Sequence, residues 1–237
     1  MKKHLPNLLT CCNALLGAIA IVFALQDNLR VAALLIICAA LFDFFDGFVA
    51  RLLHVQSDLG ADLDSQSDII SFGLAPAAIL FMWMKFCFVN LPPQLHIPPL
   101  NLLPYFAFII VPFSAYRLAK FNNDTRDKSV FYGLPTPANA FFIAFLPFAA
   151  EKLPFLDNFW VLIGLALVFS ILLIADFPMF SLKFSNFDFK KNWLKYLFLF
   201  LSALLIGAFQ FAAFPLVILL YILISLIQFG LTKVFHQ

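Results

Sequence analysis

The chain has 237 residues, of which 63% are hydrophobic and only 12% are charged. A soluble domain carries about 25% charged residues, so this composition excludes an ordinary soluble protein and indicates a polytopic membrane protein. The net charge of +2 is too small to predict binding to nucleic acid, and no nucleic-acid partner is expected.

Eight apolar runs follow one another along the chain. A helix rises about 1.5 Å per residue, so crossing a hydrocarbon core takes about 20 apolar residues. The first run is long enough to stay as a span rather than act as a cleaved signal. We therefore predict an all-α membrane helix bundle with about eight transmembrane helices. The predicted spans are Leu8–Leu25, Val31–Leu53, Ile69–Val89, Leu100–Ala119, Pro137–Ala150, Asn158–Ala175, Lys195–Gln210 and Pro215–Leu231.

Basic residues are distributed unevenly between the two sides of this topology. If the N-terminus is inside, twelve Lys and Arg residues lie inside and three outside. Cytoplasmic loops carry an excess of Lys and Arg, so both termini are predicted to be cytoplasmic. The inner set is Lys2, Lys3, Arg51, Arg117, Lys120, Arg126, Lys128, Lys183, Lys190, Lys191, Lys195 and Lys233, and the outer set is Arg30, Lys85 and Lys152.

The most polar stretch of the chain joins the second and third predicted spans. An aspartate at the centre of a membrane helix costs about 2.5–3.5 kcal/mol, so carboxylates here need compensation. Asp43 and Asp46 are three residues apart, while Gly60, Asp64 and Asp68 are each four apart. Side chains at these spacings share one face of a helix. Two such helices in contact would bring four carboxylates to one pocket, where oxygen-liganded Mg²⁺ or Mn²⁺ would relieve their repulsion.

Two glycines and an arginine accompany these carboxylates. Gly47 and Gly60 remove side chains from the same faces, which leaves room for a phosphate or nucleotide to approach the backbone. Arg51 follows about one turn later, where its guanidinium can bind a carboxylate or phosphate through two hydrogen bonds. Asp58 and Asp62 are out of phase with the other carboxylates, and we expect them to be solvated or to support the ligands indirectly.

Together these residues form the pattern Asp-x2-Asp-Gly-x2-Ala-Arg-x8-Gly-x3-Asp-x3-Asp over residues 43–68. The pattern resembles the signature of the CDP-alcohol phosphatidyltransferases, and every fixed position is filled. The resemblance implies that an alcohol displaces CMP from CDP-diacylglycerol with the help of two Mg²⁺ or Mn²⁺ ions. It also implies that Asp43, Asp46 and Asp64 are metal ligands. Asp68 would lie near the metals and is our candidate for the general base.

The first span begins with a polar stripe, Pro6-Asn7-x2-Thr10-x2-Asn13. Polar side chains in lipid need partners, so the stripe is expected to face the bundle interior. Asn7 and Thr10 either contact the nucleotide and phosphates or cap the helix. Asn13 either joins that contact or forms a simple interhelical bond. The residues predicted to bind the nucleotide and diphosphate are Asn7, Thr10, Gly47, Ala50, Arg51 and Gly60.

Two segments further along the chain indicate which alcohol accepts the phosphatidyl group. Tyr-Arg-Leu-Ala-Lys-Phe-Asn (116–122) and Gly-Leu-Pro-Thr-Pro-Ala-Asn-Ala (133–140) resemble the subfamily that makes phosphatidylserine. Arg117 and Lys120 would then hold the lipid phosphate or the acceptor carboxylate, although they could equally be ordinary anchors at the membrane surface. Lys120 replaces the more frequent arginine, which keeps the charge and loses the bidentate geometry.

The predicted reaction is transfer of a phosphatidyl group to L-serine, giving phosphatidylserine and CMP. Glycerol 3-phosphate, inositol phosphate or a second phospholipid are alternative acceptors, because a basic pair suits a phosphate as well as a carboxylate. A divalent-cation transporter is an alternative of another class. Transporters often show repeats and sites near the bilayer middle, whereas this site occurs once and near one membrane face.

The resemblance also suggests how the chain is organised. Residues 1–150 are expected to form the catalytic membrane domain and residues 151–237 additional transmembrane helices. We expect an integral protein of a bacterial inner membrane, in contact with membrane lipid, with its active site facing the cytoplasm. Similar enzymes are commonly homodimers, and the same assembly is expected here.

Overall fold

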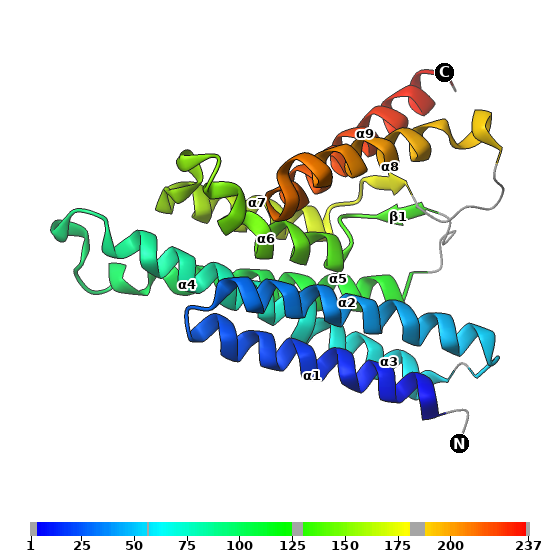
Figure 1. Cartoon of the computed structure of the whole chain (residues 1–237), viewed down its shortest axis with the longest axis horizontal. Helices are drawn as coiled ribbons and strands as arrows, with labels where there is room; N and C mark the ends of the chain where they lie inside the picture. Colours follow the sequence, from blue (N-terminus) through cyan, green and yellow to red (C-terminus); the bar gives the residue numbers. More distant parts are fainter. Residues whose placement is uncertain (1–3, 56, 125–129, 181–187, 236–237) are drawn as a thin grey trace.

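The computed structural model describes residues 4–55, 57–124, 130–180 and 188–235. Helices α1 to α5 lie side by side along the long axis of the molecule, and α8 and α9 form an oblique pair beside them (Figure 1). Helix α1 begins and helix α9 ends at the same end of the bundle. The helices are α1 (Leu5–Leu25), α2 (Leu29–Leu52), α3 (Asp58–Asp68), α4 (Ala75–Val89), α5 (Ile110–Asn122), α6 (Thr136–Ala150), α7 (Phe159–Ile174), α8 (Phe189–Phe209) and α9 (Ala213–Phe235).

Within the described ranges, five helical segments are long and apolar enough to cross a membrane. The last of them covers most of α8 and α9, and the chain reverses direction between these two helices (Figure 1), beside Gln210, where φ is 50°. Helices α6 and α7 are apolar and shorter. The prediction of an all-α, polytopic membrane bundle is thus confirmed in its broad form, whereas the count of eight spans and the side of the termini stay predictions. The five segments are Leu5–Leu25, Leu29–Leu52, Asp58–Val89, Leu100–Asn122 and Asn192–Gln228.

The third segment is one continuous helical rod that changes its winding in the middle. Helix α3 passes directly into η2 (Ile69–Leu74), a π-helical turn, which in turn passes into α4. Ser57 caps the start of α3 by accepting a hydrogen bond of 3.1 Å from the backbone N–H of Gly60. The sequence predicted a polar helix followed by a span, and the rod agrees. The π-helical turn was not predicted, and such turns are frequent at functional sites.

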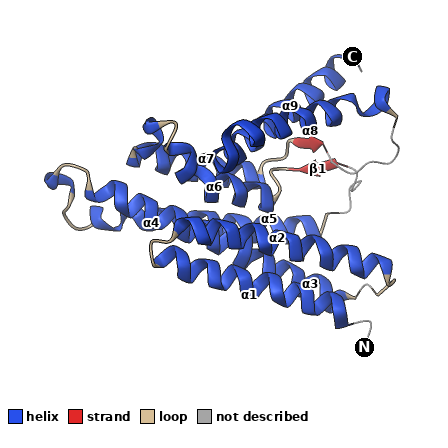
Figure 2. Cartoon of the chain, in the orientation of Figure 1, coloured by secondary structure: helices blue, strands red, loops and turns tan. Residues whose placement is uncertain are grey.

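A small antiparallel sheet joins the loops on either side of α6 and α7. Strands β1 (Val130–Tyr132) and β2 (Pro178–Phe180) pair with Val130 opposite Phe180. Figure 2 shows the two strands, in red, below α8 and α9. Both strands lie between predicted spans, and their pairing was not predicted from the sequence. By tying the start of α6 to the end of α7, the sheet fixes where α6 begins.

Helix α1 is in extensive contact with α2 and also packs on α3, η2 and α4. Its close approach to η2 depends on Gly17, because a Cβ there would lie 2.7 Å from the Cα of Ser71. The Ser71 hydroxyl donates a hydrogen bond of 2.8 Å to the backbone carbonyl of Asn13. Small residues allow membrane helices to pack backbone to backbone in this way. The contact holds Asp68, three residues before Ser71, against α1.

Replacing Gly17 with alanine is expected to lower the melting temperature of the purified protein in detergent. The added methyl group would meet the Cα and the side chain of Ser71, and overpacking of this kind typically costs about 1–3 kcal/mol. Gly164→Ala in α7 is the matched control, because a Cβ there meets nothing within 4 Å. The control should melt at or above the wild-type temperature, since alanine is the better helix former. Equal melting temperatures for the two variants would contradict the close packing of α1 on η2.

Candidate active site

Carboxylates from two helices meet beside α1. Asp43 of α2 and Asp64 and Asp68 of α3 each offer one oxygen, and these oxygens all lie within 4.8 Å of one another. Asp68 is buried, and the other two are partly buried. The convergence expected from the i,i+4 spacing is therefore present for these three side chains.

The fourth predicted carboxylate borders this cluster without belonging to it. Asp46 is only 6% exposed, and it interacts electrostatically with both Asp43 and Asp64. Its carboxylate accepts a hydrogen bond of 2.6 Å from the Thr10 hydroxyl, the short distance expected for a charged acceptor. The same hydroxyl lies 3.0 Å from the Pro6 carbonyl within α1. A hydroxyl donates once, and the shorter contact to a charged group indicates that Asp46 receives the proton.

Helix α1 also holds Asp68. The side-chain amide of Asn13 donates to an Asp68 oxygen at 3.3 Å, and both residues are buried. The polar stripe of α1 therefore faces the carboxylates, as the sequence predicted. Asn13 forms an interhelical hydrogen bond, which is one of its two expected roles, and its partner is the candidate general base. The spacing Asp68-x2-Ser71 was a signal that Ser71 would face the same helix, but nothing in the sequence named Asn13 as the partner.

A cleft of about 420 Å³ opens beside the carboxylates. Five of the six residues predicted to bind the nucleotide and diphosphate line it, together with Asp46 and Asp64. Helices α1, α2 and α3 and the loop between α2 and α3 form its walls. The lining residues are Pro6, Asn7, Thr10, Asp46, Gly47, Ala50, Val55, Ser57, Asp58, Gly60, Ala61 and Asp64.

The two glycines keep this cleft open at points where other side chains already lie close. A Cβ on Gly60 would lie 3.3 Å from the Asn7 amide oxygen, tighter than most such contacts. A Cβ on Gly47 would lie 3.4 Å from a guanidinium nitrogen of Arg51. The sixth predicted residue, Arg51, is thus placed over Gly47 at the edge of the cleft. This arrangement agrees with the expectation that the glycines let a ligand approach the backbone.

The two basic residues of α5 lie in different environments. Arg117 is only 7% exposed, and its Nε has no hydrogen-bond partner among the described residues. Its guanidinium lies 5.0 Å from the centre of the Phe121 ring and interacts electrostatically with Asp68 and Tyr221. A buried cation is stable only when paired. Arg117 therefore faces the carboxylate cluster and has hydrogen-bonding capacity left for an anionic ligand.

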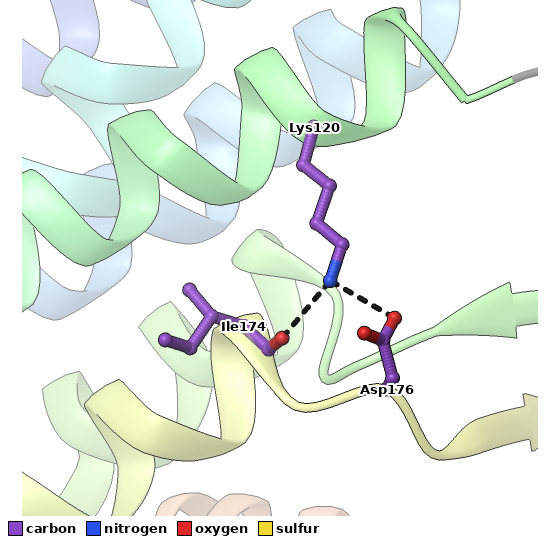
Figure 3. Close-up of polar contacts among 3 residues, drawn as sticks. All are labelled: Lys120, Ile174 and Asp176. Atoms are coloured by element: carbon purple, nitrogen blue, oxygen red, sulfur yellow. Dashed lines mark hydrogen bonds and ion pairs between the residues drawn. The ribbon is translucent and has the colours of Figure 1, made fainter.

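Lys120 is held by the end of α7. Its ammonium group donates to an Asp176 oxygen at 2.9 Å and to the Ile174 carbonyl at 3.2 Å, as Figure 3 shows. Both side chains are at least partly exposed, at 31% and 62%, so the ion pair adds little stability. A cation at the end of a helix also favours the helix dipole. The structure thus gives Lys120 a tethering contact that the sequence did not predict, and its role toward lipid phosphate or acceptor stays a prediction.

The donor set at the cluster fits a hard divalent cation. Three carboxylates share a space of a few ångströms, and within the described ranges none of them forms a salt bridge with Lys, Arg or His. Carboxylate oxygens are the ligands that Mg²⁺ and Mn²⁺ prefer. Asp43 and Asp64 would hold such an ion, and Asp68 and Asp46 would lie beside it.

These features match a known protein family. The family model of the CDP-alcohol phosphatidyltransferases matches residues 3–174, and the chain belongs to this family. The matched segment contains the carboxylates, the cleft and Arg117, and it ends with α7. The family predicted from the aspartate pattern is therefore confirmed.

Individual relatives are similar to the chain over more than half of its length. The chain is 31% identical over 176 residues to the CDP-diacylglycerol–serine O-phosphatidyltransferase of Helicobacter pylori. This aligned part covers 70% of each of the two chains. It is 30% identical over 146 residues to the Bacillus subtilis protein of the same name, covering 62% of this chain and 76% of the relative. It is 36% identical over 140 residues to the archaetidylserine synthase of Methanothermobacter thermautotrophicus, covering 57% and 54%.

Exchange of one cluster carboxylate should weaken metal binding. The purified protein is expected to bind Mn²⁺, and Asp64→Asn to weaken that binding at least about tenfold, because an amide replaces a charged ligand. Loss of the free-ion signal of Mn²⁺ in electron paramagnetic resonance measures the affinity. Asp62→Asn is the matched control, since Asp62 is exposed on the same helix and outside the cluster. Unchanged affinity in Asp64→Asn, or the same loss in both variants, would contradict the assignment.

Proposed function

We propose that the protein transfers the phosphatidyl group of CDP-diacylglycerol to L-serine, releasing phosphatidylserine and CMP. The observation that supports this most directly is the carboxylate cluster of Asp43, Asp64 and Asp68 beside a cleft lined by Asn7 and Thr10. The names of the Helicobacter and Bacillus relatives support serine as the acceptor. The archaeal relative's name also specifies a serine-containing lipid.

The cleft would receive the nucleotide and diphosphate of the donor lipid. Gly47 and Gly60 leave the backbone accessible, and Asn7 supplies amide hydrogen-bonding groups at the same wall. Arg51, above Gly47, is placed to pair with a phosphate oxygen. These contacts hold the diphosphate next to the carboxylates, so that the lipid-side phosphorus lies near Asp68.

The divalent ions expected at the carboxylates would neutralise charge on the diphosphate and on the leaving CMP. The remaining chemistry belongs to the chain itself. Transfer of a phosphoryl-type group depends mostly on positioning and charge stabilisation. Holding donor and acceptor in one orientation therefore supplies much of the rate.

Asp68 would act as the general base. The serine oxygen forms a bond to the phosphorus that carries the diacylglycerol, while the bond from that phosphorus to the bridging oxygen breaks and CMP leaves with that oxygen. The serine hydroxyl proton passes to an oxygen of Asp68. Asn13 of α1 would fix the orientation of this carboxylate by donating a hydrogen bond to one of its oxygens. Arg117, buried and in electrostatic contact with Asp68, is placed to bind the serine carboxylate.

The orientation of the protein completes the proposal. With the N-terminus inside, the excess of Lys and Arg lies on the side of the cleft, which would therefore open to the cytoplasm. Serine and the nucleotide-activated lipid are available on that side. The bundle would stand in a bacterial inner membrane.

An acceptor assay tests the reaction. Purified protein in detergent with Mn²⁺ or Mg²⁺ is expected to convert CDP-diacylglycerol and L-serine to phosphatidylserine and CMP, measured by lipid chromatography and CMP release. Glycerol 3-phosphate and inositol phosphate serve as competing acceptors. Turnover of either one without turnover of serine would reject serine and leave the class of reaction standing.

A substitution of the base tests the mechanism. Asp68→Asn is expected to lower kcat at least about a hundredfold, because general-base catalysis contributes about 10²–10⁴ in rate. Binding of CDP-diacylglycerol in the presence of Mn²⁺ should persist, and isothermal calorimetry measures it. If that binding is lost with the activity, Asp68 is a metal ligand first and the base lies elsewhere.

A further inference from the structure

Buried polar atoms without hydrogen-bond partners gather on α5 and the first turn of α6. Of nine such side-chain atoms among the described residues, five belong to Ser114, Arg117, Thr136 and Asn139. Asn139 is the most extreme case, since it is fully buried and both its amide oxygen and its amide nitrogen lack a partner. Buried polar groups in native proteins are nearly always hydrogen-bonded. A group that can both donate and accept, and does neither, indicates a ligand.

The start of α6 and the end of α5 lie at the same place in the bundle. Lys120 at the end of α5 donates to the Ile174 carbonyl of α7. In the segment that leads into α6, the Leu134 N–H donates to the Leu172 carbonyl at 2.9 Å. Gly133, with φ at 76°, passes so close to α7 that a Cβ would lie 2.6 Å from the Leu173 carbonyl oxygen. Figure 3 shows this segment passing beside the ion pair of Lys120.

The end of α5 and the start of α6 also lie beside the carboxylate cluster. Both helices pack on η2, the turn that follows Asp68. Ser114 of α5 lies against η2, because a Cβ on Gly73 would lie 3.3 Å from the Ser114 Cβ. Arg117, one turn further along α5, interacts electrostatically with Asp68. The unpartnered atoms of α6 therefore lie beyond η2, on the side of the carboxylate cluster opposite the cleft beside α1.

Helix α6 presents positive partial charge at its start. The helix is 15 residues long, and no side chain caps its first turn. Free N–H groups and the helix dipole at such an end favour an anion. The Thr136 hydroxyl is the first side-chain donor of this turn, and it is fully buried without a partner. Together with Arg117, this turn has the donors that a carboxylate requires.

We infer that Asn139 and Thr136 belong to the acceptor pocket and bind the zwitterionic head of the amino acid. The inference rests on the proposed transfer to serine. The Thr136 hydroxyl and the start of α6 donate to the serine carboxylate together with Arg117, and the Asn139 amide oxygen accepts from the serine ammonium group. Glycerol 3-phosphate could offer the Asn139 oxygen only a neutral hydroxyl, which is a weaker donor than the charged ammonium group of serine. Asn139 thereby selects an amino acid over glycerol 3-phosphate.

Kinetics with each substrate varied in turn test this inference. Asn139→Leu and Thr136→Val keep the size of the side chain and remove its hydrogen bonds. Each is expected to raise the KM for L-serine about tenfold or more, the usual loss when a hydrogen bond to a charged group is removed. The KM for CDP-diacylglycerol should stay within about twofold of wild type. Ser170→Ala is the matched control, because Ser170 of α7 is also fully buried and without a partner.

A binding readout separates recognition from folding. L-serine added with a CDP-diacylglycerol analogue and Mn²⁺ should raise the melting temperature of wild type and Ser170→Ala, and raise it less for both pocket variants. If Asn139→Leu does not fold, the rise in melting temperature on addition of L-serine is measured with Asn139→Ser and Thr136→Val instead.

The outcomes distinguish this inference from the proposed function. A wild-type protein that uses L-serine while the pocket variants keep the wild-type KM for it overturns the inference alone. An equal rise in both KM values assigns Asn139 and Thr136 to packing and also overturns it. A wild-type protein that uses another alcohol but not L-serine overturns the proposed function and this inference together.

Discussion

The structure is organised around carboxylates that two of its helices hold close together in spite of their mutual repulsion. Asp43, Asp64 and Asp68 each bring an oxygen within 4.8 Å of the other two, in helical segments long and apolar enough to cross a bilayer. Charges at such a distance in a poorly solvated place repel strongly. Arg117, a buried cation, interacts electrostatically with Asp68. A divalent cation at the cluster would neutralise this charge.

Helix α1 is what holds these charges in register. It packs along α2 and against α3 and η2, so it reaches both sources of carboxylate. Thr10 donates to Asp46 and Asn13 donates to Asp68, and Gly17 allows the backbone of α1 to meet η2. The π-helical turn lies directly after Asp68 and shifts the phase between α3 and α4. One rod can therefore present acids to the site at one end and a buried apolar face to the core at the other.

Much of this could be predicted from the sequence, because the relevant information is local. The spacing of Asp43, Asp64 and Asp68 fixes their helix faces, and hydropathy locates the long helices. What the sequence could not supply depends on contacts between distant segments. Lys120 meets Asp176 across 56 positions, and β1 meets β2 across a similar separation. Neither pairing produces a periodic pattern in the sequence from which it could have been predicted.

Burial was also beyond the reach of the sequence. Asn139 lies in a string that resembles the serine-using subfamily, but only the fold reveals that its amide is fully buried and unpaired. The same holds for Arg117, which composition alone would place at the membrane surface like other basic residues. In both cases the neighbouring helices, rather than the residue type, decide whether the side chain meets water or a ligand.

The position of bound Mn²⁺ would show whether the carboxylates of α2 and α3 share one ion. Anomalous diffraction at the manganese edge, from crystals grown with Mn²⁺, locates the ion without reference to activity. The account predicts an anomalous peak among the oxygens of Asp43, Asp64 and Asp68, within coordination distance of at least one carboxylate from each of α2 and α3. A peak that lies elsewhere, or that touches the carboxylates of only one helix, would contradict it.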